Sequence, residues 1–329
     1  MYDVARLAGV SHQTVSRVVN GSEQVRAETR DRVLTAMERL DYRPNSVARA
    51  LVTGRSRTLG VVTFGTALYG PAATLLGVER AAHAAGYFVS IVSLESLERD
   101  EVARAVERLK ALGVDGLVVI APQVPATNAL WNLSADLPVV AVEAGPENGL
   151  PVVAVDQYQG ARLATEHLLS LGHTTVHHMA GPSDWVEAQY RTEGWRDALD
   201  AAGAMGSAPL QGDWSPRSGY ELGRRLLDIP DLTAVFVAND QMALGLLRVL
   251  HEHGREVPRD VSIVGFDDIP EAEFFTPPLT TVRQDFAEMG RRGLHLLLEE
   301  IAASERSRTR VTVPATLIER ASTGPPVRR

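Results

Sequence analysis

Residues 10–21, VSHQTVSRVVNG, combine valines at helical spacing with side chains that donate and accept hydrogen bonds. If residues 11–19 form a helix, Val15, Val18 and Val19 turn inward. The polar side chains then share the opposite face: His12, Gln13, Ser16, Arg17 and Asn20. In the major groove of DNA, an arginine pairs best with guanine and a glutamine with adenine. The chemistry available to this face is therefore the recognition of base edges.

Two further helical patterns flank this segment. They cover residues 2–9 and 27–40, and the AGV stretch at residues 8–10 supplies the small residue and the glycine of a tight turn. The third helix has an apolar face at the spacing i, i+3, i+4, i+7: Val33, Ala36, Met37 and Leu40. The pattern predicts a helix-turn-helix whose second helix enters the major groove. A small three-helix bundle with a polar surface helix is the alternative.

The segment YRPNSVARALVTGRS, residues 42–56, predicts a short hinge helix that begins at Pro44 and ends at Gly54. Leu51 is unusually apolar for a plain linker, which is the alternative interpretation. In a minor-groove element, a leucine can insert between base steps while neighbouring polar side chains contact the backbone or the groove. The residues expected to contact DNA here are Asn45, Ala48, Arg49 and Leu51.

Charge is divided unevenly along the 329 residues, whose formal net charge is −8. Residues 1–58 contain ten arginines and six acidic residues, a net charge of +4, and the remainder carries −12. A basic module that meets phosphates, followed by an acidic body, fits this division. The chain has no cysteine and no segment typical of a secretion signal or a membrane span. We therefore expect a protein of the cytoplasm with no membrane partner.

From residue 58 onward, short apolar runs alternate with amphipathic helices. This rhythm predicts an α/β fold with two doubly wound lobes of parallel sheet, and ligands at the carboxyl ends of the strands between the lobes. The expected strands, all interpreted as buried, are TLGVVTF, YFVSIVSL, GLVVIA, PVVAVEA, TVHHMAG, AVFVAND, VSIVGFDD and TTVRQD. The expected helices lie near residues 72–85, 98–112, 157–171, 187–202, 216–227, 240–253 and 286–303.

Four side chains of this body suit a sugar, which needs planar hydrogen-bonding groups and an aromatic plate. Asn239 and Asp267 end predicted strands, Arg191 offers a guanidinium fork, and Trp214 offers a plate. The alternative for some of them is a role in helix capping or in the crossover between lobes. Asp240 is expected to be a helix cap rather than a ligand contact. Trp185 is either a second plate or a surface or core residue.

The sequence gives little support for a catalytic site or a metal site. Asp267 and Asp268, like His177 and His178, are neighbours on predicted strands, so their side chains point to opposite faces. His251 and His253 diverge on a helix. Neither a Walker-type phosphate loop nor a G-x-S-x-G elbow is present. We therefore expect no enzyme, no metal and no cofactor.

Several segments together resemble the lactose-repressor (LacI/GalR) family of bacterial transcription regulators, over residues 2–320. They are YDVARLAGVSHQTVSRVVN, YRPNSVARAL, LLSLGH, RTEGW, GDWS, VANDQMALG, VGFDD and LTTVRQDF, in the family's order. The resemblance implies a homodimer that binds a pseudo-palindromic operator in double-stranded DNA. It also implies a core like that of periplasmic sugar-binding proteins.

The resemblance also implies roles for individual residues. His12, Gln13 and Arg17 would read bases. Phosphates would be positioned by Ser11, Thr14, Ser16, Asn20 and Thr29. The effector pocket would comprise Leu68 to Pro71, Glu143, Arg191, Trp214, Asn239, Asp267, Gln284 and Phe286. The pocket positions Ile120, Glu143 and Glu187 depart from the residue types of the family's namesake, so a galactoside, cellobiose or another plant-derived oligosaccharide would each fit.

These observations predict a DNA-binding headpiece (1–43), a hinge (44–57), a core (58–322) and a short tail (323–329). The N-lobe would comprise residues 58–155 and 286–313, and the C-lobe residues 156–285 and 314–322. We expect a repressor of carbohydrate-utilisation genes that a bound sugar releases from its operator; the opposite, corepressor sense and a transport-type sugar-binding protein are the alternatives. Without the leucine-heptad tail of tetrameric members, a dimer is expected, and the missing helix-capping threonine predicts a start codon upstream of Met1.

Overall fold

The computed structural model describes residues 1–19, 22, 24–42, 54–94, 99–120, 122–124, 137–145, 149–303 and 307–327. The chain separates into two compact units, Met1–Arg57 and Thr58–Arg329, which are described in turn. Five residues expected to contact DNA lie outside the described residues: Asn20, Asn45, Ala48, Arg49 and Leu51.

The described part of the first unit contains α1 (Tyr2–Ala8), α2 (His12–Val19) and α3 (Ala27–Arg39). Gly9 ends α1 with a φ of 64°, a left-handed conformation that glycine adopts without strain. The helices enclose a small core of Val4, Ala5, Ala8, Val15, Val18, Val33 and Ala36. One expectation for the apolar face of α3 is wrong: Leu40 follows the last helical turn and is exposed.

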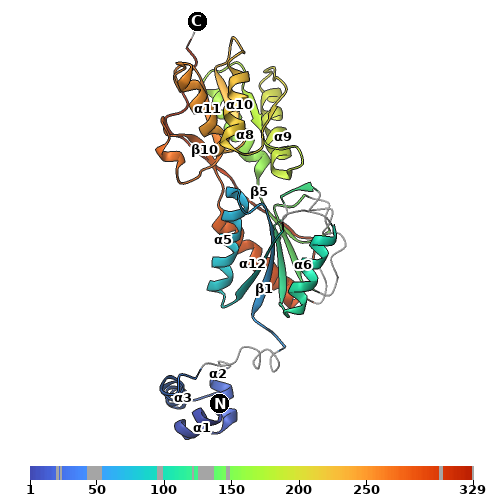
Figure 1. Cartoon of the computed structure of the whole chain (residues 1–329), viewed down its shortest axis with the longest axis vertical. Coiled ribbons are helices and arrows are strands. Elements are labelled where there is room, and N and C mark those ends of the chain that lie inside the picture. Colours follow the sequence, from blue (N-terminus) through green and yellow to red (C-terminus); the bar gives the residue numbers. More distant parts are fainter. Residues whose placement is uncertain are drawn as a thin grey trace. The chain divides into compact units, whose positions relative to one another are not determined.

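The described residues of the second unit form two six-stranded sheets, each the centre of one lobe (Figure 1). The first sheet is parallel, in the order β11-β5-β4-β3-β1-β2. Its strands are β1 (Thr58–Phe64), β2 (Phe88–Leu94), β3 (Gly116–Ile120), β4 (Val139–Val142), β5 (Val152–Val155) and β11 (Arg310–Val313). The expected two-lobed α/β fold with largely parallel sheets is confirmed.

The second sheet has the order β12-β10-β9-β8-β6-β7, and only β12 runs antiparallel to its neighbour among the described pairs. Its strands are β6 (His177–Ala180), β7 (Leu210–Gln211), β8 (Ala234–Val237), β9 (Ser262–Asp267), β10 (Thr280–Arg283) and β12 (Thr316–Ile318). The chain enters this lobe after β5, leaves it after β10 and returns between β11 and β12. The connections between the lobes are therefore short.

Helices cover both sheets, as the alternation of strands and helices predicts. Those of the first lobe are α5 (Tyr69–Ala84), α6 (Arg99–Ala111) and α12 (Phe286–Ala302). Those of the second are α8 (Gln157–Ser170), α9 (Val186–Ala201), α10 (Pro216–Leu226) and α11 (Asp240–Glu252), with a 3₁₀ turn at Ala272–Phe274. No helix within the described ranges is both long and apolar enough to cross a membrane.

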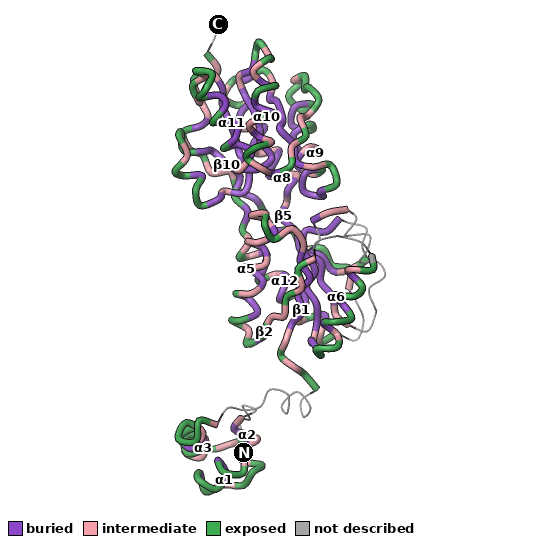
Figure 2. The backbone as a smooth tube through the Cα atoms, in the orientation of Figure 1, coloured by how far each residue is buried: buried purple, intermediate pink, exposed green. Residues whose placement is uncertain are grey.

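Most strands are buried, as the purple segments of Figure 2 show, but one expectation of burial is wrong. Strand β2 lies at the edge of its sheet and pairs with β1 alone among the described strands. Phe88 is 68% exposed and Ile91 48% exposed. Four strands escaped the sequence analysis: β5, β7, β11 and β12. They have two to four residues each, and strands of this length show no period, so only some of them can be found from the sequence.

Candidate functional site

The polar face predicted for α2 is present on the surface of the first unit. Ser11, His12, Gln13 and Arg17 are exposed, whereas Thr14, Ser16 and Thr29 are half-buried. The ring of His12 stacks on that of Tyr2, with the centroids 4.7 Å apart. Tyr2 is itself 75% exposed, so the stacked pair adds an aromatic surface beside the start of α2.

Local hydrogen bonds set the position of α2. The Ser11 hydroxyl oxygen accepts a hydrogen bond from the backbone N–H of Thr14 (3.1 Å), as a helix N-cap does. From α3, the guanidinium of Arg32 donates to the carbonyl oxygens of Ala8 and Gly9, the second at 3.3 Å. Ser11 therefore has a structural role that accounts for its polarity without any contact to DNA.

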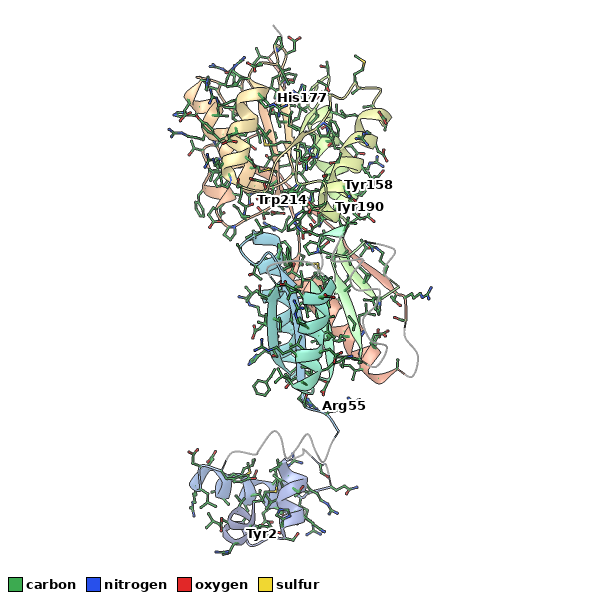
Figure 3. The ribbon with its side chains drawn as sticks, turned by 45° about the vertical axis from the view of Figure 1, so that its right-hand side comes forward. Tyr2, Arg55, Tyr158, His177, Tyr190 and Trp214 are labelled. Carbon is green, nitrogen blue, oxygen red and sulfur yellow. The ribbon has the colours of Figure 1, made fainter. Side chains whose placement is uncertain are left out.

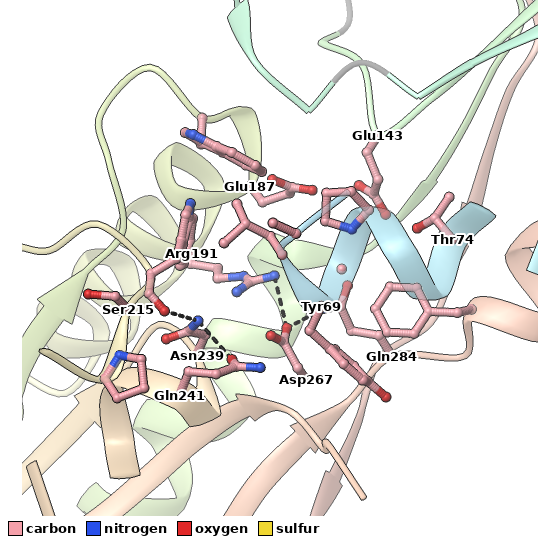
Figure 4. A pocket seen from close by; sticks show the side chains of 18 residues that line it. Tyr69, Thr74, Glu143, Glu187, Arg191, Ser215, Asn239, Gln241, Asp267 and Gln284 are labelled. Atoms are coloured by element: carbon pink, nitrogen blue, oxygen red, sulfur yellow. Dashed lines mark hydrogen bonds and ion pairs between the residues drawn. The ribbon is translucent and has the colours of Figure 1, made fainter. Parts of the chain in front are cut away.

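In the second unit, a cavity of about 280 Å³ lies between the two lobes (Figure 4). Every predicted ligand-binding residue lines it: Leu68 to Pro71, Glu143, Arg191, Trp214, Asn239, Asp267, Gln284 and Phe286. Glu187, also predicted as a pocket position, and Trp185, considered as a second aromatic plate, line it as well. Five further lining residues were not predicted: Ala67, Thr74, Ser215, Pro216 and Gln241. Ile120, treated as a pocket position, is instead buried in the core of the first lobe.

The carboxyl ends of parallel strands explain why distant residues meet here. Glu143 directly follows β4, Gln284 directly follows β10, and Asp267 is the last residue of β9. Asn239 follows β8 and caps α11, since its side-chain oxygen accepts a hydrogen bond from the N–H of Met242 (2.9 Å). Its amide nitrogen also donates to the carbonyl oxygen of Trp214 (3.0 Å), which ties the tryptophan loop to the helix.

The prediction that Asp240 is a helix cap is wrong, because Asn239 holds that position. Asp240 is the first residue of α11 and is fully buried. Its carboxylate accepts hydrogen bonds from the Thr281 hydroxyl (2.6 Å) and the Ile269 N–H (2.9 Å). Burial, together with the nearby negative charge of Asp267, raises the pKa of Asp240. Asp240 therefore joins α11 to β10 and to the loop after β9.

A hydrogen-bonded network surrounds Arg191 on the floor of the cavity. Its guanidinium donates to the side-chain oxygen of Gln157 (2.9 Å) and to the carbonyl oxygen of Ala238, and it lies 3.6 Å from the Asp267 carboxylate. Gln284 donates to the same carboxylate (2.6 Å) and accepts from Gln157 (2.8 Å). The network fixes the fork and the carboxylate before any ligand enters.

Two tryptophans form the aromatic part of the cavity. Trp185 and Trp214 meet edge to face, with centroids 5.6 Å apart and planes at 75°. Figure 3 shows Trp214 at the end of its lobe nearest the other lobe, far from His177. Gly181 allows this position, because a Cβ there would lie 2.1 Å from the indole ring. Trp214 is only 7% exposed, and its indole N–H has no hydrogen-bond partner among the described residues.

Backbone strain is concentrated at the cavity. Glu143, Trp214 and Asp267 have φ values of 57°, 72° and 110°, a region that residues with a Cβ rarely adopt. Each such residue costs about 1 to 3 kcal/mol, and the cost is tolerated where a side chain must be held in a functional position. All three were predicted to bind ligand.

Burial raises the pKa values of the acidic residues in the cavity. Desolvation raises the pKa of Asp267 to about 6, although Arg191 and Gln284 oppose the shift. Desolvation also raises the pKa of Glu143 to about 7, against the hydrogen bond from Val155 and the charges of Arg191 and Arg310. The pKa of Glu187 is raised by burial and then by the charge of Glu143. Perturbed acids in a cleft are typical of a functional site.

The residues considered for catalysis and metal binding have other partners. His178 is buried and stacks on Phe236 with the centroids 4.7 Å apart, and burial lowers its pKa to about 4. Asp268 is absent from the cavity lining and forms ion pairs with Arg283 (2.6 Å) and Arg320 (2.7 Å). Across the described ranges, no cluster of three or more potential metal ligands is found.

Comparison with known proteins identifies the family to which this architecture belongs. Residues 1–45 match the family described as "Bacterial regulatory proteins, lacI family", and residues 165–323 match a "Periplasmic binding protein-like domain". The lactose operon repressor of Escherichia coli (strain K12) is 35% identical over 98% of this chain and 90% of its own length. This chain belongs to the lacI family.

Other lacI-family members are similar over the same length. The HTH-type transcriptional regulator CelR of Thermobifida fusca is 37% identical over 97% of this chain and 96% of its own. A crystal structure of the lac repressor dimer bound to operator and the anti-inducer ONPF superposes with a TM-score of 0.86 at 34% identity, covering 98% of both chains. A CelR–cellobiose complex superposes with a TM-score of 0.73 at 35% identity, covering 97% of this chain and 98% of that one.

Proposed function

We propose that this chain is a transcriptional repressor of carbohydrate-utilisation genes. Two copies bind a pseudo-palindromic operator in double-stranded DNA, and a sugar or glycoside in the cavity between the core lobes controls that binding. The observation that carries the proposal is the meeting of the predicted sugar-binding residues in one cavity, in a chain whose residues 1–45 match the lacI family. The operator-bound lac repressor dimer and the cellobiose-bound CelR support it.

In this proposal, residues 1–43 are the headpiece, residues 44–57 the hinge and residues 58–322 the effector-binding core. His12, Gln13 and Arg17 contact base edges, and the neighbouring hydroxyl groups position phosphates. The exposed polar face of α2 supports these roles. As in the sequence analysis, the hinge residues Asn45, Ala48, Arg49 and Leu51 are assigned to the minor groove. The protein acts in the cytoplasm and catalyses no reaction.

Effector binding releases the operator in this proposal. The lobes are joined by short connections after β5, after β10 and between β11 and β12, so a ligand that contacts both lobes can change their mutual angle. A coupling free energy of about 1 to 3 kcal/mol between two sites changes affinity by about 5- to 150-fold. That range is sufficient to regulate transcription.

The test uses purified full-length protein and a library of palindromic duplexes at modest ionic strength. We expect selection of one preferred site, and release from it when a glycoside that binds the core is added. Equal affinity for all duplexes would overturn the DNA-binding assignment. Sugar binding detected by calorimetry, without a change in operator affinity, would overturn the regulatory one.

A further inference from the structure

Glu143 and Glu187 occupy one end of the cavity, and each comes from a different lobe. Glu143 follows β4 of the first lobe, whereas Glu187 lies in the first turn of α9 in the second. Glu143 is 5% exposed and Glu187 is 8% exposed. Figure 4 shows both carboxyl groups on the same side of the cavity, and they are close enough for the charge of Glu143 to raise the pKa of Glu187. An incoming ligand would therefore meet both acids at once.

The charges that line the cavity do not balance. Among its described lining residues, three are acidic (Glu143, Glu187 and Asp267) and one, Arg191, is basic. Arg191 already contacts Asp267, Gln157 and the carbonyl of Ala238. Arg310 acts on Glu143 from outside the lining. The two glutamates thus form a region of excess negative charge.

A buried carboxylate without an ion pair is costly, so Glu143 and Glu187 tend to hold protons, although the Val155 N–H donates a hydrogen bond to Glu143 (3.0 Å). Burial raises the pKa of Glu143 to about 7, and the pKa of Glu187 is raised further by the charge of Glu143. A bound cation would replace these protons and stabilise both carboxylates in their ionised form. A neutral sugar would leave the protons in place.

The aromatic wall gives an independent indication of the ligand. The Trp214 indole N–H is buried without a partner in the described chain, so an acceptor on a ligand is expected there. Trp185 and Trp214 also present π surfaces to the same cavity. Such surfaces attract cations as well as the apolar faces of sugar rings. A saccharide that carries an ammonium group satisfies the acids, the indole N–H and the rings together.

We propose that the effector is an amino sugar whose ammonium group lies between Glu143 and Glu187. This inference rests on the proposed function, because it assumes that the cavity binds a saccharide. An ammonium has three N–H donors and no acceptor, which suits two neighbouring carboxylates. The lobes would close on it, since it attracts a glutamate from each.

The experiment compares three β-1,4-linked disaccharides by calorimetry on the full-length protein: cellobiose, the glucosamine dimer and its N,N′-diacetylated form. The skeleton is shared, and only the glucosamine dimer is cationic. We expect it to bind at least about tenfold more tightly than either neutral disaccharide, since hydrogen bonds to charged groups exceed neutral ones by this order. Binding measured between pH 6 and pH 7, in buffers of different ionisation enthalpy, should release protons.

Two variants isolate the pair. Glu187→Gln keeps the shape of the side chain and should abolish the preference for the cationic disaccharide, together with the proton release. Glu193→Gln, at an exposed position of the same helix, removes the same charge outside the cavity and should preserve both. The comparison of the three disaccharides on the unmodified protein does not depend on the folding of either variant.

Cellobiose binding as tight as the glucosamine dimer, an unchanged preference in Glu187→Gln, or no binding of the dimer would each overturn the inference. The proposed function has a separate readout, which is release of the selected operator. If cellobiose releases the operator and the cationic disaccharide does not, the amino-sugar inference fails while the repressor function stands. If the glucosamine dimer binds tightly but leaves the operator bound, the ligand class stands and the regulation fails.

Discussion

Arg191 and Asp267 form a buried ion pair on the floor of the cavity, with 3.6 Å between Nη2 and Oδ1. The same Asp267 oxygen accepts a hydrogen bond from Gln284 at 2.6 Å. Gln284 lies where the chain leaves the second lobe for α12 of the first. A ligand that bonds to Asp267 therefore acts on the group that contacts the connection between lobes. Ligand binding at Asp267 can therefore affect the angle between the two lobes.

Replacing this carboxylate should separate ligand response from DNA binding. We expect Asp267→Ala to abolish operator release by sugar, because the fork of Arg191 loses its partner and the ligand loses an acceptor. Operator binding without ligand should persist, since the headpiece is a separate compact unit. Operator affinity measured over a sugar titration checks both. Asp200→Ala, at an exposed position of α9, is the matched control and should respond normally. A normal response of Asp267→Ala would show that the pocket is wrongly assigned.

The pH dependence of stability should carry the signature of Glu143. The pKa of Glu143 is about 7 in the folded chain and near its ordinary value of 4.5 when unfolded, so between these pH values the folded state binds a proton that the unfolded state has released. The free energy of unfolding then falls as pH rises through this window, by up to about 1.4 kcal/mol per pH unit.

Urea unfolding of wild type and Glu143→Gln at several pH values measures this effect as a difference. The difference should decline from about pH 4.5 to pH 7 and stay level above it. His178, whose pKa is lowered to about 4, acts in the opposite direction but cancels, because both proteins contain it. A difference that is independent of pH would mean that Glu143 is ionised throughout.

Much of the site could be predicted because its residues follow strands. Asn239 and Asp267 come at the ends of apolar runs, and the switch-point rule places such residues together. Arg191 and Trp214 follow from the chemistry that a sugar needs, and only the resemblance to the family adds the others. By contrast, β11 and β12 lie next to each other along the chain but belong to different lobes. Such a crossing depends on which neighbours the strands find, and periodicity contains no information about it.

The electrostatics of the cavity could not be predicted either. The resemblance predicts Glu187 as a pocket position, but its proximity to Glu143 arises from the meeting of two lobes and has no signal in the sequence. The left-handed backbone of Trp214 and Asp267 is equally hidden, since tryptophan rarely adopts it and most aspartates do not adopt it either.

The contact between α5 and α12 gives a test of packing in the first lobe. Gly77 and Gly290 let the two backbones approach, and a Cβ on Gly290 would lie 2.2 Å from the backbone of Gly77. We expect Gly290→Ala to lower the free energy of unfolding by about 1 to 3 kcal/mol, as overpacking does. Gly293→Ala, one turn later in α12, would meet only Val142 at 3.8 Å and should be neutral or stabilising. Denaturant unfolding distinguishes them, and equal effects would refute the close contact.

Arg17, exposed near the end of α2, gives the sharpest test of the headpiece. If its guanidinium pairs with a guanine of the operator, Arg17→Ala should lose about 1 to 3 kcal/mol of discrimination at one base pair per half-site. Affinity for the other bases at that position should change little, so the protein should lose its preference there rather than prefer another base. Arg39→Ala removes the same charge from α3 and should leave base preference intact, weakening binding uniformly if it acts at all. Affinities for all four bases at each operator position, measured at constant salt, decide between the outcomes. A uniform loss in Arg17→Ala would place its side chain on a phosphate instead of a base.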